Sequence, residues 1–306
     1  MPLADFIARQ RHQRNALILS LASMILSLGA GDGRQVRTLQ IGTSGSLTPA
    51  DESGTGKGAL AALGSLMKDE AGFDAKIVRQ NGWRELADNL AKGQFQLGFF
   101  QGYEFAWASE KNSHLKPLLV ASKESRSPYL VVSVVARQDN PAKDFAGLEQ
   151  QSLTIPDTGE RDLRLFIDRT ARSKGRSPEK FFSKISSPHN VEEALDEVVD
   201  GRVQATVVDR AILEAYQRRK PGRFAQLKEV VRSPSLPPTV LAYDDRILDE
   251  ATARQIRDGL LAAASKDKPE MTLGLFHWRR FDRVPEDFDK ILAETRKAYP
   301  PPTSRP

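Results

Sequence analysis

The fold is decided by the stretch from Lys76 to Trp107, which reads KIVRQNGWRELADNLAKGQFQLGFFQGYEFAW. A β-branched run over Ala75–Arg79 comes first, an amphipathic segment over Trp83–Ala91 follows it, and the apolar run Gln96–Phe100 comes next. This alternation predicts a strand, a helix and a second strand, with another helix over Glu104–Lys111. A unit of this kind favours parallel strands joined by helical crossovers.

The same alternation extends outward on both sides of this stretch, and the chain after Tyr243 reads mainly as helices. We therefore predict an α/β protein of two lobes, each a mainly parallel sheet flanked by helices, with a cleft between them. The further strands are expected at Val36–Gly42, Leu118–Ala121, Tyr129–Ala136, Ser152–Ile155, Lys184–Ser186, Ala205–Val208, Leu227–Val231 and Thr239–Tyr243. The further helices are expected at Gly58–Glu70, Arg161–Lys174, Val191–Asp200, Arg210–Arg218, Asp249–Ala264, Glu270–Leu275 and Pro285–Ala298.

Two polar, proline-containing stretches mark where the chain passes between the lobes. SKESRSP precedes the strongest interior strand, and SPSLPP, at Ser233–Pro238, precedes the strand at Thr239. Two such crossings make residues 131–235 an inserted second lobe. The first lobe then consists of residues 32–130 plus 236–306.

The N-terminus has the pattern of an export signal. Three arginines precede the uncharged run Ala16–Leu28, which is too short to span a bilayer as a helix, and the small residues Gly29–Gly31 follow it. We predict that residues 1–30 are a secretory signal peptide, cleaved near Gly29–Gly31, and that the mature protein is periplasmic. The alternative is an amphipathic first helix, but this run is apolar all round.

Composition excludes several functions. The 306 residues include no cysteine, which rules out thiol catalysis, disulfides, cysteine-ligated metals and a lipoprotein anchor. The net charge of +5 falls to +3 once residues 1–30 are removed, because they carry three arginines and one aspartate. No basic run interleaved with aromatic residues occurs, so we expect no nucleic-acid partner.

A loop rich in serine, threonine and glycine follows the first predicted strand. It reads TSGSLTPADESGTGK, contains Ser44, Ser46 and Thr48, and leads to a helix expected to begin near Gly58. It lacks the residues of a Walker A motif at Asp51 and Gly58. Hydroxyls and free N–H groups before a helix favour an anion site, and a plain connecting loop is equally compatible.

Other polar residues follow predicted strands, where α/β folds bind ligands. Each of these residues also has a structural interpretation. Tyr103 could cover the core, Thr158 and Asp209 could cap helices, and a lone loop histidine such as His189 is more often structural. An arginine in a first helical turn opposes the helix dipole, so an acidic ligand or carboxylate would explain Arg161. Gln101 is also a candidate for ligand binding, because it directly follows the predicted strand Gln96–Phe100.

The sequence gives no positive argument for catalysis. It contains no H-E-x-x-H motif, no G-x-S-x-G elbow and no acid–base pair that spacing can assign. His114 and His277 have no partners at metal-ligand spacing. We therefore expect a protein that is not an enzyme and that has no metal or cofactor.

Nearly the whole mature chain has a resemblance to a known family, and two blocks show it most clearly. The clearest is Lys76–Ala121, and the second is SSPHNVEEALDEVVDGRVQATVVDRAILEAY, at Ser186–Tyr216. Both resemble the phosphate- and phosphonate-type substrate-binding proteins of ABC transporters, a branch of the type II periplasmic binding proteins. The resemblance implies a two-lobed, monomeric protein that closes on an oxyanion and delivers it to a permease in the inner membrane.

The resemblance also implies site residues. His189 would contact phosphonate or phosphate oxygens, and Asp209 would take an acidic place that can pair with a ligand amine. The family's aromatic residue falls at Tyr103 or Phe105. Where relatives have a run of Ser and Thr, this chain has DTGER with Thr158 as its one hydroxyl, and Arg161 could replace hydroxyl recognition by a charged fork.

Two function hypotheses follow. The first is a periplasmic solute-binding protein that captures a small oxyanion through Ser44, Ser46, Thr48, Gln101, Tyr103, Thr158, Arg161, His189 and Asp209. The second is an exported sensory or accessory protein that binds a small metabolite, or a partner such as a periplasmic enzyme or sensor kinase. An enzyme on this scaffold is the least favoured interpretation.

Overall fold

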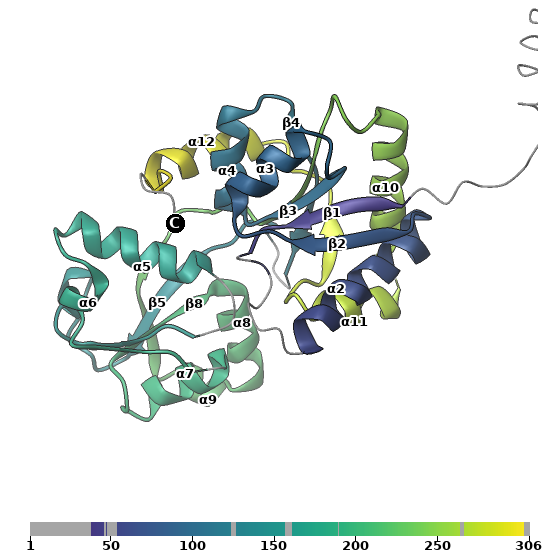
Figure 1. Cartoon of the computed structure of the whole chain (residues 1–306). Helices are drawn as coiled ribbons and strands as arrows, with labels where there is room; N and C mark the ends of the chain where they lie inside the picture. Colours follow the sequence, from purple (N-terminus) through teal and green to yellow (C-terminus); the bar gives the residue numbers. More distant parts are fainter. Residues whose placement is uncertain are drawn as a thin grey trace, which may run out of the picture. The chain divides into compact units, whose positions relative to one another are not determined.

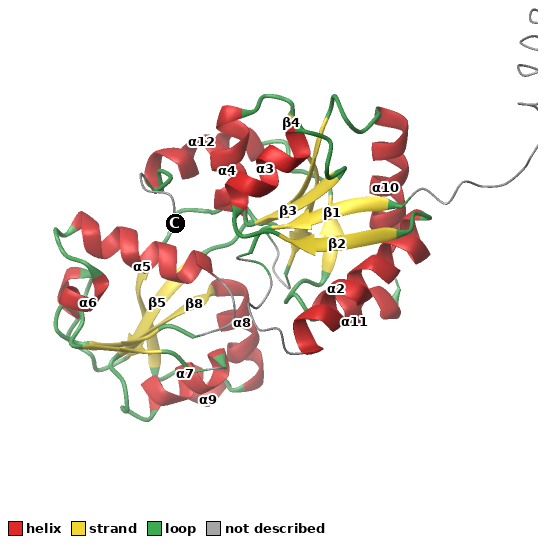
Figure 2. Cartoon of the chain, viewed as in Figure 1, coloured by secondary structure: helices red, strands yellow, loops and turns green. Residues whose placement is uncertain are grey.

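The computed structural model describes residues 38–45, 47, 54–123, 127–156, 161–188, 190–263 and 266–302, and at 54, 55 and 267–269 it describes the backbone alone. Within these ranges, eleven strands form two separate sheets, and helices pack on both faces of each (Figures 1 and 2). The α/β prediction is confirmed. The predicted signal peptide, residues 1–30, lies outside the described residues.

The first sheet has six strands in the order β11-β4-β10-β3-β1-β2. β1 pairs in parallel with β2 and β3, whereas β10 lies antiparallel between β3 and β4, and β11 lies antiparallel on the outer edge of β4. Four strands, β1 to β4, therefore point the same way. Their bounds are β1 (Leu39–Thr43), β2 (Ala75–Arg79), β3 (Leu97–Phe100), β4 (Leu115–Ser122), β10 (Thr239–Asp244) and β11 (Arg280–Asp282).

The second sheet has five strands in the order β7-β6-β8-β5-β9. β6 pairs in parallel with β7 and β8, and β5 runs antiparallel to both of its neighbours. β5 is thus the one strand of this sheet that opposes the other four. Their bounds are β5 (Val132–Arg137), β6 (Ser152–Thr154), β7 (Lys184–Ser186), β8 (Ala205–Asp209) and β9 (Leu227–Arg232).

Two hydrophobic cores sandwich the first sheet. On one face, Ile41, Phe99 and Trp278 belong to a core in which the rings of Phe99 and Trp278 stack at 5.4 Å. On the other face, Trp83 and Trp107 are in contact and belong to a core rich in aromatic side chains. The first core is covered by α2 (Gly54–Leu66), the π-helical turn η1 (Met67–Ala71), α10 (Glu250–Ala262) and α11 (Asp267–Gly274), and the second by α3 (Trp83–Ala91), α4 (Gly102–Lys111) and α12 (Phe288–Ala298).

The second sheet is built in the same way. Phe166 and Phe181 belong to the core on one face, and Leu195, Leu213 and Tyr216 to the core on the other. Burial of apolar side chains on both faces explains why these strands read as continuous apolar runs. The first core is covered by α5 (Arg161–Ser173), α6 (Pro178–Phe181) and the 3-10 turn η2 (Ala146–Leu148), and the second by α7 (Val191–Val199), α8 (Arg210–Arg219) and α9 (Pro221–Phe224).

Several elements differ from the sequence predictions: η2 and α9 were not predicted, α4 and β4 begin earlier than predicted, and α2 and β11 differ for identifiable reasons. α2 begins at Gly54 and not near Gly58, because the helix extends back over a turn with two glycines, whose low helix propensity hides it. β11, Arg280–Asp282, lies between the predicted helices Glu270–Leu275 and Pro285–Ala298, where no strand was predicted, and pairs with the edge of β4. A three-residue strand shows no periodicity of its own, so only its pairing partner defines it.

The two segments that pass between the sheets are joined to each other. The N–H of Leu130 donates to the carbonyl of Leu236 at 3.0 Å, and the N–H of Leu236 donates back at 2.8 Å. After α12, the indole N–H of Trp107 donates to the carbonyl of Tyr299 at 2.6 Å, while the Tyr299 side chain lies in the core of the second sheet. Both crossing segments and the described residue Tyr299 therefore link the two sheets.

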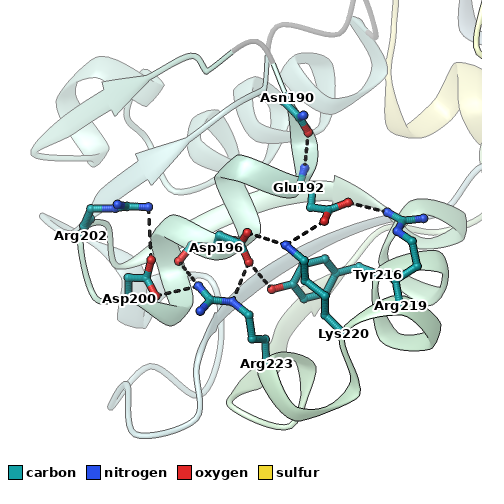
Figure 3. Close-up of polar contacts among 9 residues, drawn as sticks. All are labelled: Asn190, Glu192, Asp196, Asp200, Arg202, Tyr216, Arg219, Lys220 and Arg223. Carbon is teal, nitrogen blue, oxygen red and sulfur yellow. Dashed lines mark hydrogen bonds and ion pairs between the residues drawn. The ribbon is translucent and has the colours of Figure 1, made fainter.

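A network of ion pairs ties α7 to α8 and α9 (Figure 3). At its centre, Asp196 accepts hydrogen bonds from the Tyr216 hydroxyl at 2.6 Å, Lys220 at 2.8 Å and Arg223 at 2.7 Å. Burial alone would raise the pKa of Asp196, but these three donors outweigh it and lower the pKa. One carboxylate thus binds three side chains, from α8, from α9 and from the residue between these two helices.

A buried carboxylate on β10 predicts acid sensitivity. Asp244 is fully buried and accepts two hydrogen bonds from the Arg246 guanidinium and one from Asn112. These bonds, the Arg246 pair first, lower the pKa of Asp244 to about 2. A lowered folded-state pKa stabilises the fold above about pH 4, and this stabilisation is lost as the pH falls through about 2.

We expect the free energy of unfolding to lose about 2 kcal/mol from Asp244 between pH 5 and pH 2. Urea unfolding of the wild type and of Asp244→Asn across this range measures the contribution, because the variant lacks the titrating group. Identical pH slopes for the two proteins would contradict it.

Candidate functional site

The site candidates lie at the carboxyl ends of strands in both sheets. Ser44 follows β1, Gln101 and Tyr103 follow β3, and Asp209 ends β8, while Arg161 begins α5 after β6. Four further candidates lie outside the described residues, namely Ser46, Thr48, Thr158 and His189. The structure therefore places five of the nine.

Ser44 and Glu104 join the ends of β1 and β3. Ser44 is fully buried, and its hydroxyl donates to Glu104 Oε2 at 2.5 Å, while its N–H donates to the carbonyl of Phe99 at 3.0 Å. The same carboxylate oxygen accepts the N–H of Gln101 at 3.3 Å, which completes a capping box at the start of α4. Both the hydroxyl and the N–H of Ser44 are therefore hydrogen-bonded within the protein.

Tyr103 is 5% exposed and packs edge-on against Trp107, with ring centroids 4.9 Å apart. Burial raises the pKa of Tyr103 well above 10, and the negative charges of Glu104 and Asp162 raise it further, whereas Arg161 opposes them. The phenol therefore stays protonated.

Arg161 is exposed and occupies the first turn of α5, next to the buried Asp162. Its positive charge lies at a helix N-terminus, where the backbone already presents donor N–H groups. An anion at this position would interact favourably with both. The observed position of Arg161 is therefore compatible with the anion-binding hypothesis.

Asp209 makes two interactions through its two carboxylate oxygens. Oδ1 accepts the N–H of Ala211 at 2.9 Å, so the predicted N-cap role is confirmed. Oδ2 accepts a hydrogen bond from Lys123 Nζ at 2.9 Å, and the Asp209 side chain is 3% exposed and the Lys123 side chain 23%. This ion pair connects the end of β8 with the residue after β4, and so links the two sheets.

Glu104 and Lys123 are the two residues at the strand ends that the sequence predictions missed. The spacing of Gln101 and Glu104 is that of a capping box, so Glu104 could have been identified from it. Lys123 lies in the polar stretch SKESRSP and is separated from Asp209 by most of the second sheet. Nothing in its local sequence distinguishes it from a solvated lysine.

The start of α4 also contacts the second crossing segment, Ser233–Pro238. A Cβ atom on Gly102 would lie 1.8 Å from the carbonyl oxygen of Pro237 and 2.6 Å from that of Pro238. Such a distance is possible only for a residue without a side chain. Gly102 thus lets the helix that follows β3 lie directly against the segment that leads back to β10.

Two kinds of site are not found in the part of the chain that the structure describes. No group of three or more His, Asp or Glu residues there is arranged to hold a metal ion. Within the same ranges, no helix has both the length and the apolar character needed to cross a membrane.

Comparison with known proteins identifies one matching family. The model of the family "ABC transporter, phosphonate, periplasmic substrate-binding protein" matches residues 46–287. Comparison with curated protein sequences gives no match.

Several solved structures share the fold. A binding protein component of an ABC phosphonate transporter from Pseudomonas aeruginosa is 14% identical, with 86% of this chain and 88% of that chain covered and a TM-score of 0.53. XAC2383 from Xanthomonas citri, bound to chloride ion, is 16% identical, with 86% and 97% covered and a TM-score of 0.58. PhnD1 from Prochlorococcus marinus (MIT 9301), in complex with methylphosphonate, is 13% identical, with 86% and 98% covered and a TM-score of 0.53. At these identities the likeness concerns the two-lobed fold alone.

Proposed function

Since the chain belongs to the family of periplasmic substrate-binding proteins of phosphonate ABC transporters, we propose that it captures a small oxyanion of the phosphate or phosphonate class and delivers it to a permease. The family is one of binding proteins and not of enzymes, and it works with ABC transporters. The observation that carries the proposal is the ion pair of Asp209 and Lys123, which brings strand ends of both sheets together.

We further propose that the two sheets are the cores of two lobes, residues 32–130 plus 236–306 and residues 131–235. In support, the strands of the first sheet come from both sides of the second in the sequence. The paired residues Leu130 and Leu236 lie at the two proposed boundaries. A pair of short crossing segments is a suitable hinge for closure around a ligand.

The proposed oxyanion contacts are the candidates at the strand ends. Arg161 supplies charge and the N–H groups of α5 supply donors, together with Gln101, Tyr103, Ser46, Thr48, Thr158 and His189. Ser44 and Asp209 act through their neighbours, because Ser44 donates to Glu104 and Asp209 accepts from Lys123. The proposed protein is monomeric, uses no cofactor, and is exported with cleavage of residues 1–30.

The ligand class is tested by isothermal titration of protein that has been unfolded and refolded to remove any carried-over ligand. The titrants are phosphate, phosphite, methylphosphonate and 2-aminoethylphosphonate. Binding of at least one of them is expected. If none of them produces heat, the oxyanion proposal is wrong and a sensory or accessory role becomes the better hypothesis.

Arg161→Gln is expected to weaken the binding of the oxyanion by at least about tenfold, because a charge-assisted hydrogen bond contributes about 1.5–3 kcal/mol. Without ligand, the same change should leave the free energy of unfolding equal or slightly higher, since it removes a cation from a helix N-terminus. Calorimetry measures the first effect and urea unfolding the second. Arg164→Gln, an exposed arginine on the same helix, is the matched control. Equal losses of affinity in the two variants would argue against a specific role for Arg161.

A further inference from the structure

Lys123 supplies an internal cation at the carboxyl end of β8. Its ammonium lies 2.9 Å from Asp209 Oδ2, and the other oxygen of this carboxylate accepts the N–H of Ala211. The Asp209 side chain is almost completely buried. A buried carboxylate requires a compensating partner, and here the chain itself provides that partner.

This arrangement bears on which ligands the site accepts. A buried aspartate at a strand end would attract a ligand ammonium if no cation of the protein were paired with it. Because Lys123 is paired with Asp209, the two side chains together have no net charge. A ligand ammonium that approaches Asp209 is therefore repelled by the ammonium of Lys123. The ligand must therefore compete with Lys123 for the same oxygen or forgo the interaction.

We infer that Lys123 is a specificity-determining residue that occupies the cation position next to Asp209 and makes the site favour oxyanions without an amino group. The inference rests on the proposed function, because it concerns the ligand of the same site. It names alkylphosphonates and inorganic phosphorus oxyanions as the preferred ligand class, ahead of aminoalkylphosphonates.

Ethylphosphonate and 2-aminoethylphosphonate form a matched pair of probes, because they differ by one ammonium group. The measured quantity is the ratio of their dissociation constants, determined by calorimetry at pH 7. In the wild type, ethylphosphonate should bind at least as tightly as the amino compound. In Lys123→Ala, which leaves Asp209 without this cation, the ratio should move at least tenfold toward the amino compound.

Three further variants separate specificity from simple stabilisation of the fold. The double variant Lys123→Ala with Asp209→Asn should return the ratio to that of the wild type, because the attracting carboxylate is gone. Lys116→Ala removes a lysine from the other end of β4 and should leave the ratio unchanged. Asp209→Asn retains a good N-cap and should weaken the amino compound at least threefold relative to ethylphosphonate.

Each outcome has a defined meaning. A wild type that binds the amino compound more tightly than ethylphosphonate, or a ratio unaffected by Lys123→Ala, overturns the role of Lys123 while the binding function stands. A wild type that binds neither probe, nor phosphate or phosphite, overturns the proposed function and this inference with it. Should Lys123→Ala fail to fold, the wild type and Asp209→Asn still decide the matter, because the second keeps the lysine and the helix cap.

Discussion

Replacement of Gly102 by alanine is expected to lower the free energy of unfolding by about 3 kcal/mol or more. The added Cβ would lie 1.8 Å from the carbonyl oxygen of Pro237 and 2.4 Å from its carbonyl carbon, and both atoms are backbone atoms of the second crossing segment. A flexible side chain could move aside, but this backbone is fixed by the hydrogen bonds of the neighbouring Leu236. Relief therefore requires a shift of α4 or of the crossing segment.

Gly58→Ala is the matched control, because a Cβ at this position in α2 would meet nothing within 4 Å. It should raise the free energy of unfolding by about 0.5–1 kcal/mol through the better helix propensity of alanine. Urea unfolding of both variants, followed by circular dichroism, measures the difference. A Gly102→Ala protein within about 1 kcal/mol of the wild type would contradict the contact.

Asp196→Ala should lower the free energy of unfolding by about 3 kcal/mol, because it removes the common acceptor of Tyr216, Lys220 and Arg223 (Figure 3). The loss should be largest at neutral pH. The pKa of Asp196 is lowered in the folded protein, so its stabilisation is present above the ordinary pKa of a carboxyl group and is lost as the pH falls through the lowered value. The difference between variant and wild type should therefore shrink in acid.

Asp200→Ala provides the comparison for Asp196. Asp200 lies on the same network and accepts from Arg223, but its side chain is 39% exposed. An exposed pair of this kind contributes at most about 1 kcal/mol. Thermal or urea unfolding of the two variants at pH 7 checks the ranking, and equal effects would show that Asp196 is not the centre of the network.

Much of the fold was predictable because it depends on burial. Strands such as Lys184–Ser186 and helices such as Trp83–Ala91 have the predicted bounds, since apolar periodicity and turn residues mark them locally. β11 was missed because its three residues gain their structure from pairing with the edge of β4. The start of α2 was misplaced because glycines obscure a helix that tertiary contacts stabilise.

The candidate site was predictable as a location but less so in its interactions. Topology alone places Gln101, Arg161 and Asp209 at strand ends. The partners that these residues and Ser44 meet come from elsewhere in the chain, as with Lys123 and Asp209. A pair formed between two sheets has no local spacing, so the periodicity of neither segment indicates it.

The position of β10 has a consequence for the order in which the molecule can assemble. β10 lies between β3 and β4, yet it is synthesised only after every strand of the second sheet. Until it arrives, β3 and β4 each present an unpaired edge, which is the feature that promotes wrong pairing between chains. The second sheet, by contrast, is contiguous in sequence and can form as soon as its own strands are made. The sheet that starts first during synthesis is therefore completed last.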